Sequence, residues 1–89
     1  MKAVWKFPLG FADYTLVDMP RGAVLLFVAM QEDRLCLWAL VDTDAPTKPR
    51  SFRIAGTGHP IRDEDAPRWV GTVMLHGANL IFHVFEVTP

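Results

Sequence analysis

The sequence predicts an all-β protein, an antiparallel β-sandwich or partly open barrel of about seven short strands with little or no helix. Its apolar stretches are short, and turn-forming residues separate them at fairly regular spacing. The chain has 89 residues, of which 51% are hydrophobic and 21% charged. This size and composition indicate a single globular domain spanning residues 1–89.

Two short strands are predicted near the N-terminus. Residues 3–7 alternate, with Trp5 and Phe7 on one face, and Pro8 ends the strand. Residues 14–18 form the second strand, which ends at a turn containing proline and glycine.

Residues 23–30 and 35–41 are apolar throughout, and a polar connector of hairpin length joins them. Their short length favours two paired central strands over buried helix. Both faces of these strands are apolar, and the sequence contains no amphipathic helix to cover the second face. We therefore expect self-association through apolar surface, as a homodimer in its simplest form or as a higher oligomer.

Pro46 and Pro49 predict a loop over residues 42–49. This loop opens with Asp42-Thr43-Asp44, which is similar to the start of a calcium loop. It lacks the glycine and the distal glutamate of such loops, so a capped turn on the surface is expected instead.

Residues 50–55 alternate cleanly, which places Phe52 and Ile54 inward and Arg53 outward. A turn over residues 56–60 follows this strand.

A charged loop over residues 61–68, with room for one helical turn, leads to the last two strands, 69–75 and 79–87. The tripeptide His76-Gly77-Ala78 joins them as a hairpin, and its glycine supplies unusual backbone angles.

The turn after the fifth strand is also the candidate binding site. Its glycines leave backbone N–H groups open to approach, beside a hydroxyl and a titratable ring, so that it could hold a phosphate or a partner carboxylate. The candidate ligand- or partner-binding residues are Arg53, Gly56, Thr57, Gly58, His59, Arg62 and Trp69. The simpler alternative, favoured because short glycine motifs are unspecific, is a tight β-turn with no ligand.

No catalytic residue, metal site or cofactor is expected, and the protein is not expected to be an enzyme. Cys36 is the only cysteine and lies in an apolar run, which indicates a buried thiol. His59, His76 and His83 lack the close spacing of structural zinc ligands, and no nucleophile elbow is present. We expect His83 to be a hydrogen-bonded residue in or beside the core.

Most aromatic side chains are expected in the core, because several of them alternate with aliphatic residues. The residues in question are Trp5, Trp38, Phe52, Phe82 and Phe85. Trp69, which follows Arg68 at the end of a loop, is expected to be partly exposed. The net charge of −1 gives no general attraction to nucleic acid or to an anionic membrane, so neither is an expected partner.

Four blocks carry a family resemblance that covers nearly the whole chain. They are WKFP (residues 5–8), CLWALVDTDAP (36–46), GTGHP (56–60) and FHVFE (82–86). With these blocks the chain resembles a family of short, uncharacterised proteins of tailed bacteriophages and prophages. The resemblance implies a viral protein in the cytoplasm of the bacterial host, and it transfers no catalytic residues.

The expected function is non-enzymatic binding by a phage-encoded intracellular protein. Small phage proteins include host-takeover factors and antagonists of bacterial defence, so we expect a factor that engages a host protein or a small anionic, nucleotide-like ligand. The alternative is a minor virion or assembly component with a structural role. This expectation rests on analogy with a class of proteins, because a fold does not decide function.

Overall fold

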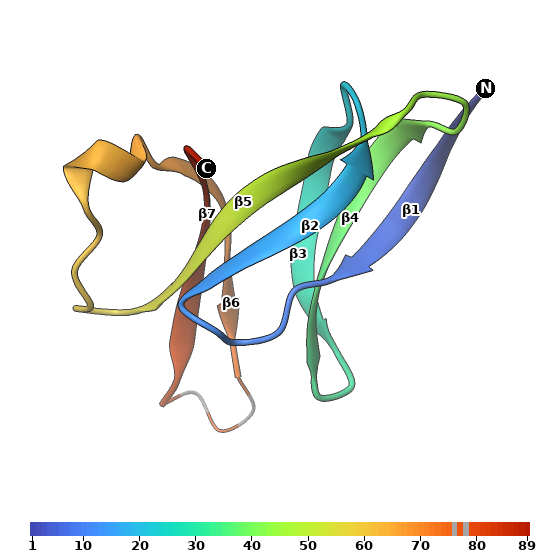
Figure 1. The fold of residues 1–89 in the computed structure, drawn as a ribbon. Coiled ribbons are helices and arrows are strands. Elements are labelled where there is room, and N and C mark those ends of the chain that lie inside the picture. Colours follow the sequence, from blue (N-terminus) through green and yellow to red (C-terminus); the bar gives the residue numbers. More distant parts are fainter. Residues whose placement is uncertain (76, 78) are drawn as a thin grey trace.

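Seven strands and one short 3₁₀ helix form the fold, which this computed structural model describes for residues 1–75, 77 and 79–89. The elements are β1 (Lys2–Pro8), β2 (Tyr14–Pro20), β3 (Val24–Gln31), β4 (Arg34–Asp42), β5 (Thr47–Gly56), η1 (Asp63–Asp65), β6 (Arg68–Met74) and β7 (Ile81–Val87). They make two antiparallel sheets, ordered β1-β4-β3 and β2-β5-β7-β6 (Figure 1). The predicted all-β class is confirmed.

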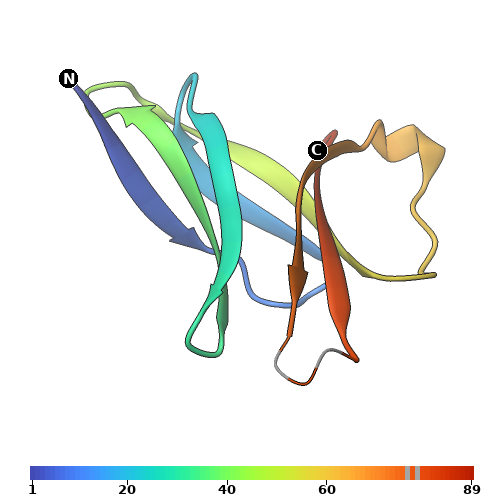
Figure 2. The ribbon, with the colours of Figure 1, turned by 180° about the vertical axis from the view of Figure 1, so that it is seen from behind.

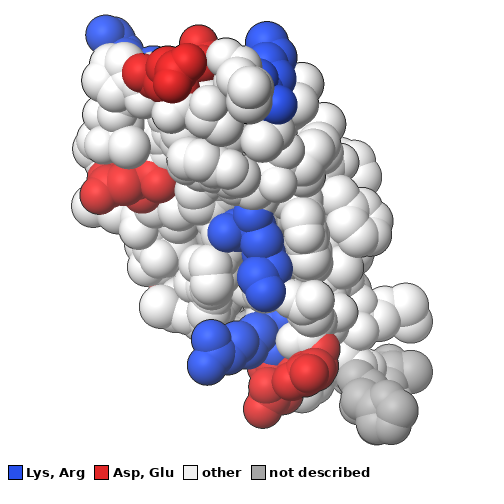
Figure 3. Space-filling view, turned by 90° about the vertical axis from the view of Figure 1, so that its right-hand side faces the viewer, with Lys and Arg blue, Asp and Glu red and all other residues white. Residues whose placement is uncertain are grey.

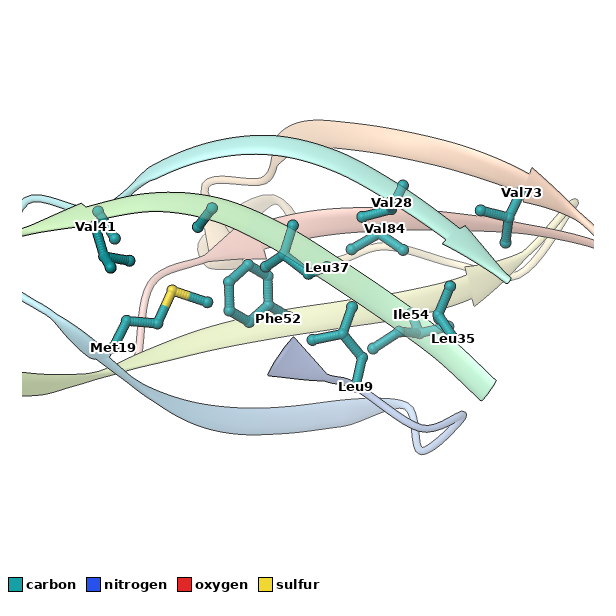
Figure 4. Close-up of a cluster of buried hydrophobic side chains, with 12 residues drawn as sticks. Leu9, Met19, Val28, Leu35, Leu37, Val41, Phe52, Ile54, Val73 and Val84 are labelled. Atoms are coloured by element: carbon teal, nitrogen blue, oxygen red, sulfur yellow. The ribbon is translucent and has the colours of Figure 1, made fainter. Parts of the chain in front are cut away.

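The core lies between the two sheets, as strand alternation requires. Alternate residues of β4, namely Leu35, Leu37, Ala39 and Val41, are buried on its inner face. Phe52 and Ile54 of β5 meet them from the other sheet (Figure 4). Period-two patterning therefore placed Phe52 and Ile54 correctly, because successive strand residues point to opposite faces. In β4 both faces are apolar, so the pattern did not show which face would be buried.

The two sheets meet at a corner where β3 lies beside β6 (Figure 2). A side chain on Gly71 of β6 would overlap Cγ2 of Val28 in β3, so only glycine allows this approach. The register of β6 against β7 also shifts between Trp69 and Gly71, next to the close contact. A bulge and a glycine together bring the sheet edges near each other.

Strands β3 and β4 form the predicted hairpin, with Gln31 opposite Arg34. Only β4 is central, however, and the expectation that both strands are central is wrong. β3 is the edge of its three-stranded sheet, because its free side faces the corner with β6 rather than another hydrogen-bonded strand.

Strand β5 begins at Thr47, inside the segment predicted to be a loop. Pro49 pairs with Asp18 of β2, whereas pairing with β7 begins only at Ser51. The side of β5 that lacks a partner at this point can accept a residue without an N–H. The loop prediction was wrong here because proline is tolerated where a strand is paired on one side only.

The predicted hairpin tip falls partly outside the described residues, since His76 and Ala78 are not among them. Gly77 has a φ of 95°, as expected for a glycine in such a turn.

Candidate functional site

The loop after β5 forms the predicted turn. The backbone N–H of His59 donates to the carbonyl of Gly56 at 3.0 Å, and Gly58 has a φ of 89°, which favours glycine. The imidazole of His59 folds back over Gly56, since a side-chain carbon there would lie 3.2 Å from Cε1 of the ring. Backbone conformation therefore favours glycine at position 58, whereas at position 56 a side chain would be tight against the ring of His59.

Arg53 faces outward, on the side opposite Phe52 and Ile54, as expected, but it is enclosed and not open to solvent. Arg53 is only 6% exposed. The guanidinium donates to the carbonyls of Asp13, Ile54 and Pro60, at 3.3, 2.6 and 3.0 Å. It also lies over the ring of Tyr14, at 5.4 Å from the centroid. The side chain does lie on the outer face of its sheet, but the following loop folds back over it.

Two further contacts hold this loop against the outer face of the four-stranded sheet. The hydroxyl of Tyr14 donates to Oδ2 of Asp65 at 2.5 Å, and this hydrogen bond is the main reason why the pKa of Tyr14 is raised. The backbone N–H of Thr88 donates to the carbonyl of Asp65 at 2.8 Å. The loop leaves the body of the protein after β5 and returns at β6 (Figure 1).

The candidate residues separate into different surroundings rather than forming one anion site. Arg62 is exposed and pairs with Glu64 at 3.4 Å. Thr57 and Trp69 belong to one chain of hydrogen bonds centred on His83. His59 and Thr57 line a hollow of ≈ 270 Å³ beside β7. Arg53 and Arg62 are therefore both engaged elsewhere.

His83 of β7 connects two of the candidate residues. Its Nε2 lies 2.8 Å from Oγ1 of Thr57, and its Nδ1 lies 3.0 Å from Oγ1 of Thr72. The indole N–H of Trp69 donates to the same Thr72 hydroxyl at 3.0 Å. The predicted hydrogen-bonded histidine beside the core is confirmed, and Trp69 is 65% exposed as expected.

The arrangement around His83 brings a hydroxyl to a ring nitrogen, as in a nucleophile–base pair. A threonine, instead of a carboxylate, contacts the second ring nitrogen, and the indole already donates to that threonine. Sequence analysis missed this role of His83 because it depends on the β6–β7 register, in which Thr72 lies opposite His83. The network can position a ligand group by hydrogen bonding.

A different surface stands out on the three-stranded sheet, whose outer face no element of the described chain covers. Because the odd-numbered residues from Leu35 to Val41 face the core, Trp38 and Leu40 face outward. Phe27 lies opposite Trp38, with ring centroids 5.9 Å apart, and Val4 and Val24 flank Leu40 on either side.

Several of these side chains are largely exposed, with Phe27 at 60%, Val4 at 55% and Val24 at 52%. Seen from the side on which β1 lies, the molecule shows mostly uncharged surface with a few separate charged groups (Figure 3). The expectation that Trp38 is a core residue is therefore wrong, since it lies half-buried on the outer face. Trp5 is opposite the core residue Ala39 and so faces inward, but it is 40% exposed and is not part of the core either.

One hydrogen bond crosses this outer face. The ammonium of Lys6 in β1 donates to Oε1 of Gln31 in β3 at 2.7 Å, spanning β4 near Cys36. Cys36 lies on this outer side of β4 but is only 1% exposed, and its predicted burial is confirmed.

The remaining sequence-based sites have structural roles. The N–H of Asp44 donates to Oδ1 of Asp42 at 3.1 Å, so the predicted capped turn is confirmed. Within residues 1–75, 77 and 79–89, no three His, Cys, Asp or Glu side chains gather as metal ligands would. Among the same residues, no helix has the length and apolar character needed to span a membrane.

A partly buried ion pair lies at the other end of the four-stranded sheet. Arg50 binds Glu86 through two hydrogen bonds of 2.7 and 2.8 Å, and a third donor of Arg50 reaches the carbonyl of Ala23 at 2.6 Å. The hydrogen bonds from Arg50 hold the pKa of Glu86 below its usual value, against the effect of burial. Sequence analysis did not predict this pair, because its members are 36 residues apart.

A family model described as a domain of unknown function (DUF7352) matches residues 1–89. No curated protein and no solved structure matches the chain.

Proposed function

We propose that this chain, which belongs to the DUF7352 family over residues 1–89, is a non-enzymatic binding protein that self-associates through an exposed surface. The observation that supports this proposal is the uncovered apolar face of the β1-β4-β3 sheet. The opposite sheet is different, because its own loop folds over the outer face around Arg53. A soluble monomer rarely leaves such a continuous apolar face open.

A second copy of the chain is the proposed occupant of this face. The patch combines half-exposed valine, leucine and phenylalanine side chains, which would face copies of themselves across a two-fold axis. A standard interface buries about 800 Å² on each partner. That is more than an apolar patch of about 300–600 Å² provides, so polar residues would form the rim of the proposed interface.

Sedimentation at micromolar concentration tests the proposal with two matched variants. Phe27→Ser removes an exposed ring from the proposed interface and should shift the protein from a stable multiple toward the 10.0 kDa species. Leu16→Ser is the control, because Leu16 is 66% exposed on β2 of the other sheet and should leave the assembly unchanged. Circular dichroism checks that both variants remain folded.

Two results would contradict self-association through this face. One is a wild-type protein that stays at 10.0 kDa at every concentration. The other is an equal effect of both substitutions, which would show that the β1-β4-β3 face has no special role.

The biological setting is proposed from the resemblance to phage proteins. On that basis the protein is encoded by a bacteriophage or prophage, works in the bacterial cytoplasm, and takes part in host takeover or in antagonism of bacterial defence. It would engage a host protein or a small anionic, nucleotide-like ligand. Deleting the gene from the phage or prophage that encodes it should reduce plating on a defence-bearing host, and wild-type but not Phe27→Ser should restore it.

A structural role in the virion is the alternative. In that case the protein is present at constant copy number in purified particles, and its deletion impairs particle assembly equally on all hosts. Mass spectrometry of purified particles distinguishes the two roles.

A further inference from the structure

A basic hollow lies where the turn between β2 and β3 meets the first residues of β5 and β6. Its volume is ≈ 390 Å³, and its described lining includes four cationic side chains and one carboxylate. They are Arg21, Lys48, Arg50, Arg68 and Glu86. For a chain with a net charge of −1, this is a strong local concentration of positive charge.

Glu86, the carboxylate in this hollow, is already paired with Arg50. Arg50, with a side chain only 21% exposed, holds both oxygens of Glu86. Arg68 also approaches Oε1 of Glu86, at 3.2 Å, but its side chain is 75% exposed and several of its donors face solvent. The Arg50–Glu86 pair therefore forms an electrically balanced floor, and further positive charge stands around it.

The rim of the hollow carries that further charge. Arg21 and Lys48 are both exposed, and within the described residues neither takes part in an ion pair. The position of Arg21 is set by its backbone N–H, which donates to the carbonyl of Pro46 at 2.8 Å. Strand pairing places Lys48 opposite Met19, at the same end of the sheet. Three cations thus surround the hollow from three different elements.

A second hollow of ≈ 350 Å³ adjoins the first and shares its floor. Both hollows are lined by Lys48, Arg50, Arg68 and Glu86. The second is also lined by uncharged residues, which include Ser51, Val87 and Thr88. The two hollows together have a charged end and a more apolar end, which is the character of a site for an organic anion.

We propose that this double hollow binds a phosphorylated small molecule, with its phosphate on Arg21, Lys48 and Arg68 and its organic part over Val87 and Thr88. Arginine forks bind phosphate oxygens in pairs, lysine adds a point charge, and several cations together suit the multiple negative charge of a phosphate group. The inference rests on the proposed function and deepens it, because it gives the small anionic ligand a site, and binding in the hollow does not depend on dimerisation. It also places the anion site away from the loop at residues 56–62.

Pyrophosphate is the probe for the first experiment. Its binding is measured by calorimetry and by changes in amide chemical shifts at low ionic strength, where screening is weak. Binding should shift amides of the β2–β3 turn and of the first residues of β5 and β6. Lys48→Gln and Arg21→Gln should each weaken binding on the order of fivefold, because each removes one charge-assisted contact. Arg34→Gln is the matched control, because it also removes one exposed positive charge. Arg34 begins β4, whereas Pro46, whose carbonyl holds the backbone of Arg21, follows the other end of that strand.

Three results would overturn the proposal. The first is the absence of both heat and shift changes with pyrophosphate. The second is an equal loss of affinity in Arg34→Gln and Lys48→Gln, which would indicate only a general charge effect. The third is equal binding of citrate, a carboxylate of similar charge, which would show that the hollow does not select phosphate. Self-association is tested separately by Phe27→Ser. That variant should leave pyrophosphate binding unchanged, so a failure of one proposal can be told from a failure of the other.

Discussion

Gly71 shows how one residue determines the way the two sheets join. It lies in β6 directly against Val28 of β3, and the two residues are 43 positions apart in the chain. Its φ is not in the left-handed region, so the requirement for glycine here is one of space, not of backbone conformation. The core residue Val28 is 6% exposed and has little freedom to move away.

Gly71→Ala should therefore destabilise the protein by about 1–3 kcal/mol, as overpacking does in a dense core. Val28→Ala removes the methyl groups that the new side chain would overlap. The double variant should lose less stability than the sum of the two single losses, with a coupling on the order of 1 kcal/mol. Urea denaturation of the four proteins measures this, and strict additivity would show that the two residues do not constrain each other.

At the scale of elements, the segment between β5 and β6 acts as a strap over the outer face of its sheet. Arg53 fixes its beginning through the carbonyl of Pro60, and Tyr14 and Thr88 fix its end through Asp65. Strand alternation predicted only that Arg53 faces outward. It could not predict that a loop from the same chain would cover it.

Arg53→Ala should lower the free energy of unfolding by about 2–3 kcal/mol, because three carbonyl groups lose their donor in a mostly buried place. Arg62→Ala is the control, since Arg62 is exposed and has only a surface ion pair. Thermal unfolding compares the two variants. An unchanged melting temperature for Arg53→Ala would show that the strap does not need this residue.

At the scale of the whole molecule, the pair Arg50–Glu86 links several parts of the fold. Arg50 lies in β5 and Glu86 in the neighbouring β7, while the contact of Arg50 with Ala23 reaches the start of the other sheet. Since the pKa of Glu86 is lowered in the folded state, its stabilising effect is complete above its usual value of 4.5. That effect is lost as the pH falls from there toward the lower folded-state pKa.

The free energy of unfolding should accordingly decrease as the pH falls below about 4.5, and Glu86→Gln should show a shallower decrease. Glu64→Gln is the control, because Glu64 pairs with Arg62 at an exposed position and should keep the wild-type slope. Urea unfolding between about pH 3 and pH 6 provides the comparison. Identical slopes for all three proteins would exclude Glu86 as a main source of acid sensitivity.

The sequence by itself determined the strand content, the β3–β4 hairpin, the inward face of β5, the turn after β5 and the burial of Cys36 and Phe52. These features depend on local alternation, short apolar runs and turn residues, which are visible within a few positions. Only the tertiary structure decided which apolar face remained open, which arginine was enclosed, and which cations gathered around Glu86. Those outcomes depend on strand order and on contacts between residues dozens of positions apart, such as Gly71 with Val28. The pattern of Trp38 shows the difference, since alternation places it on a face of β4 but cannot say whether another layer covers that face.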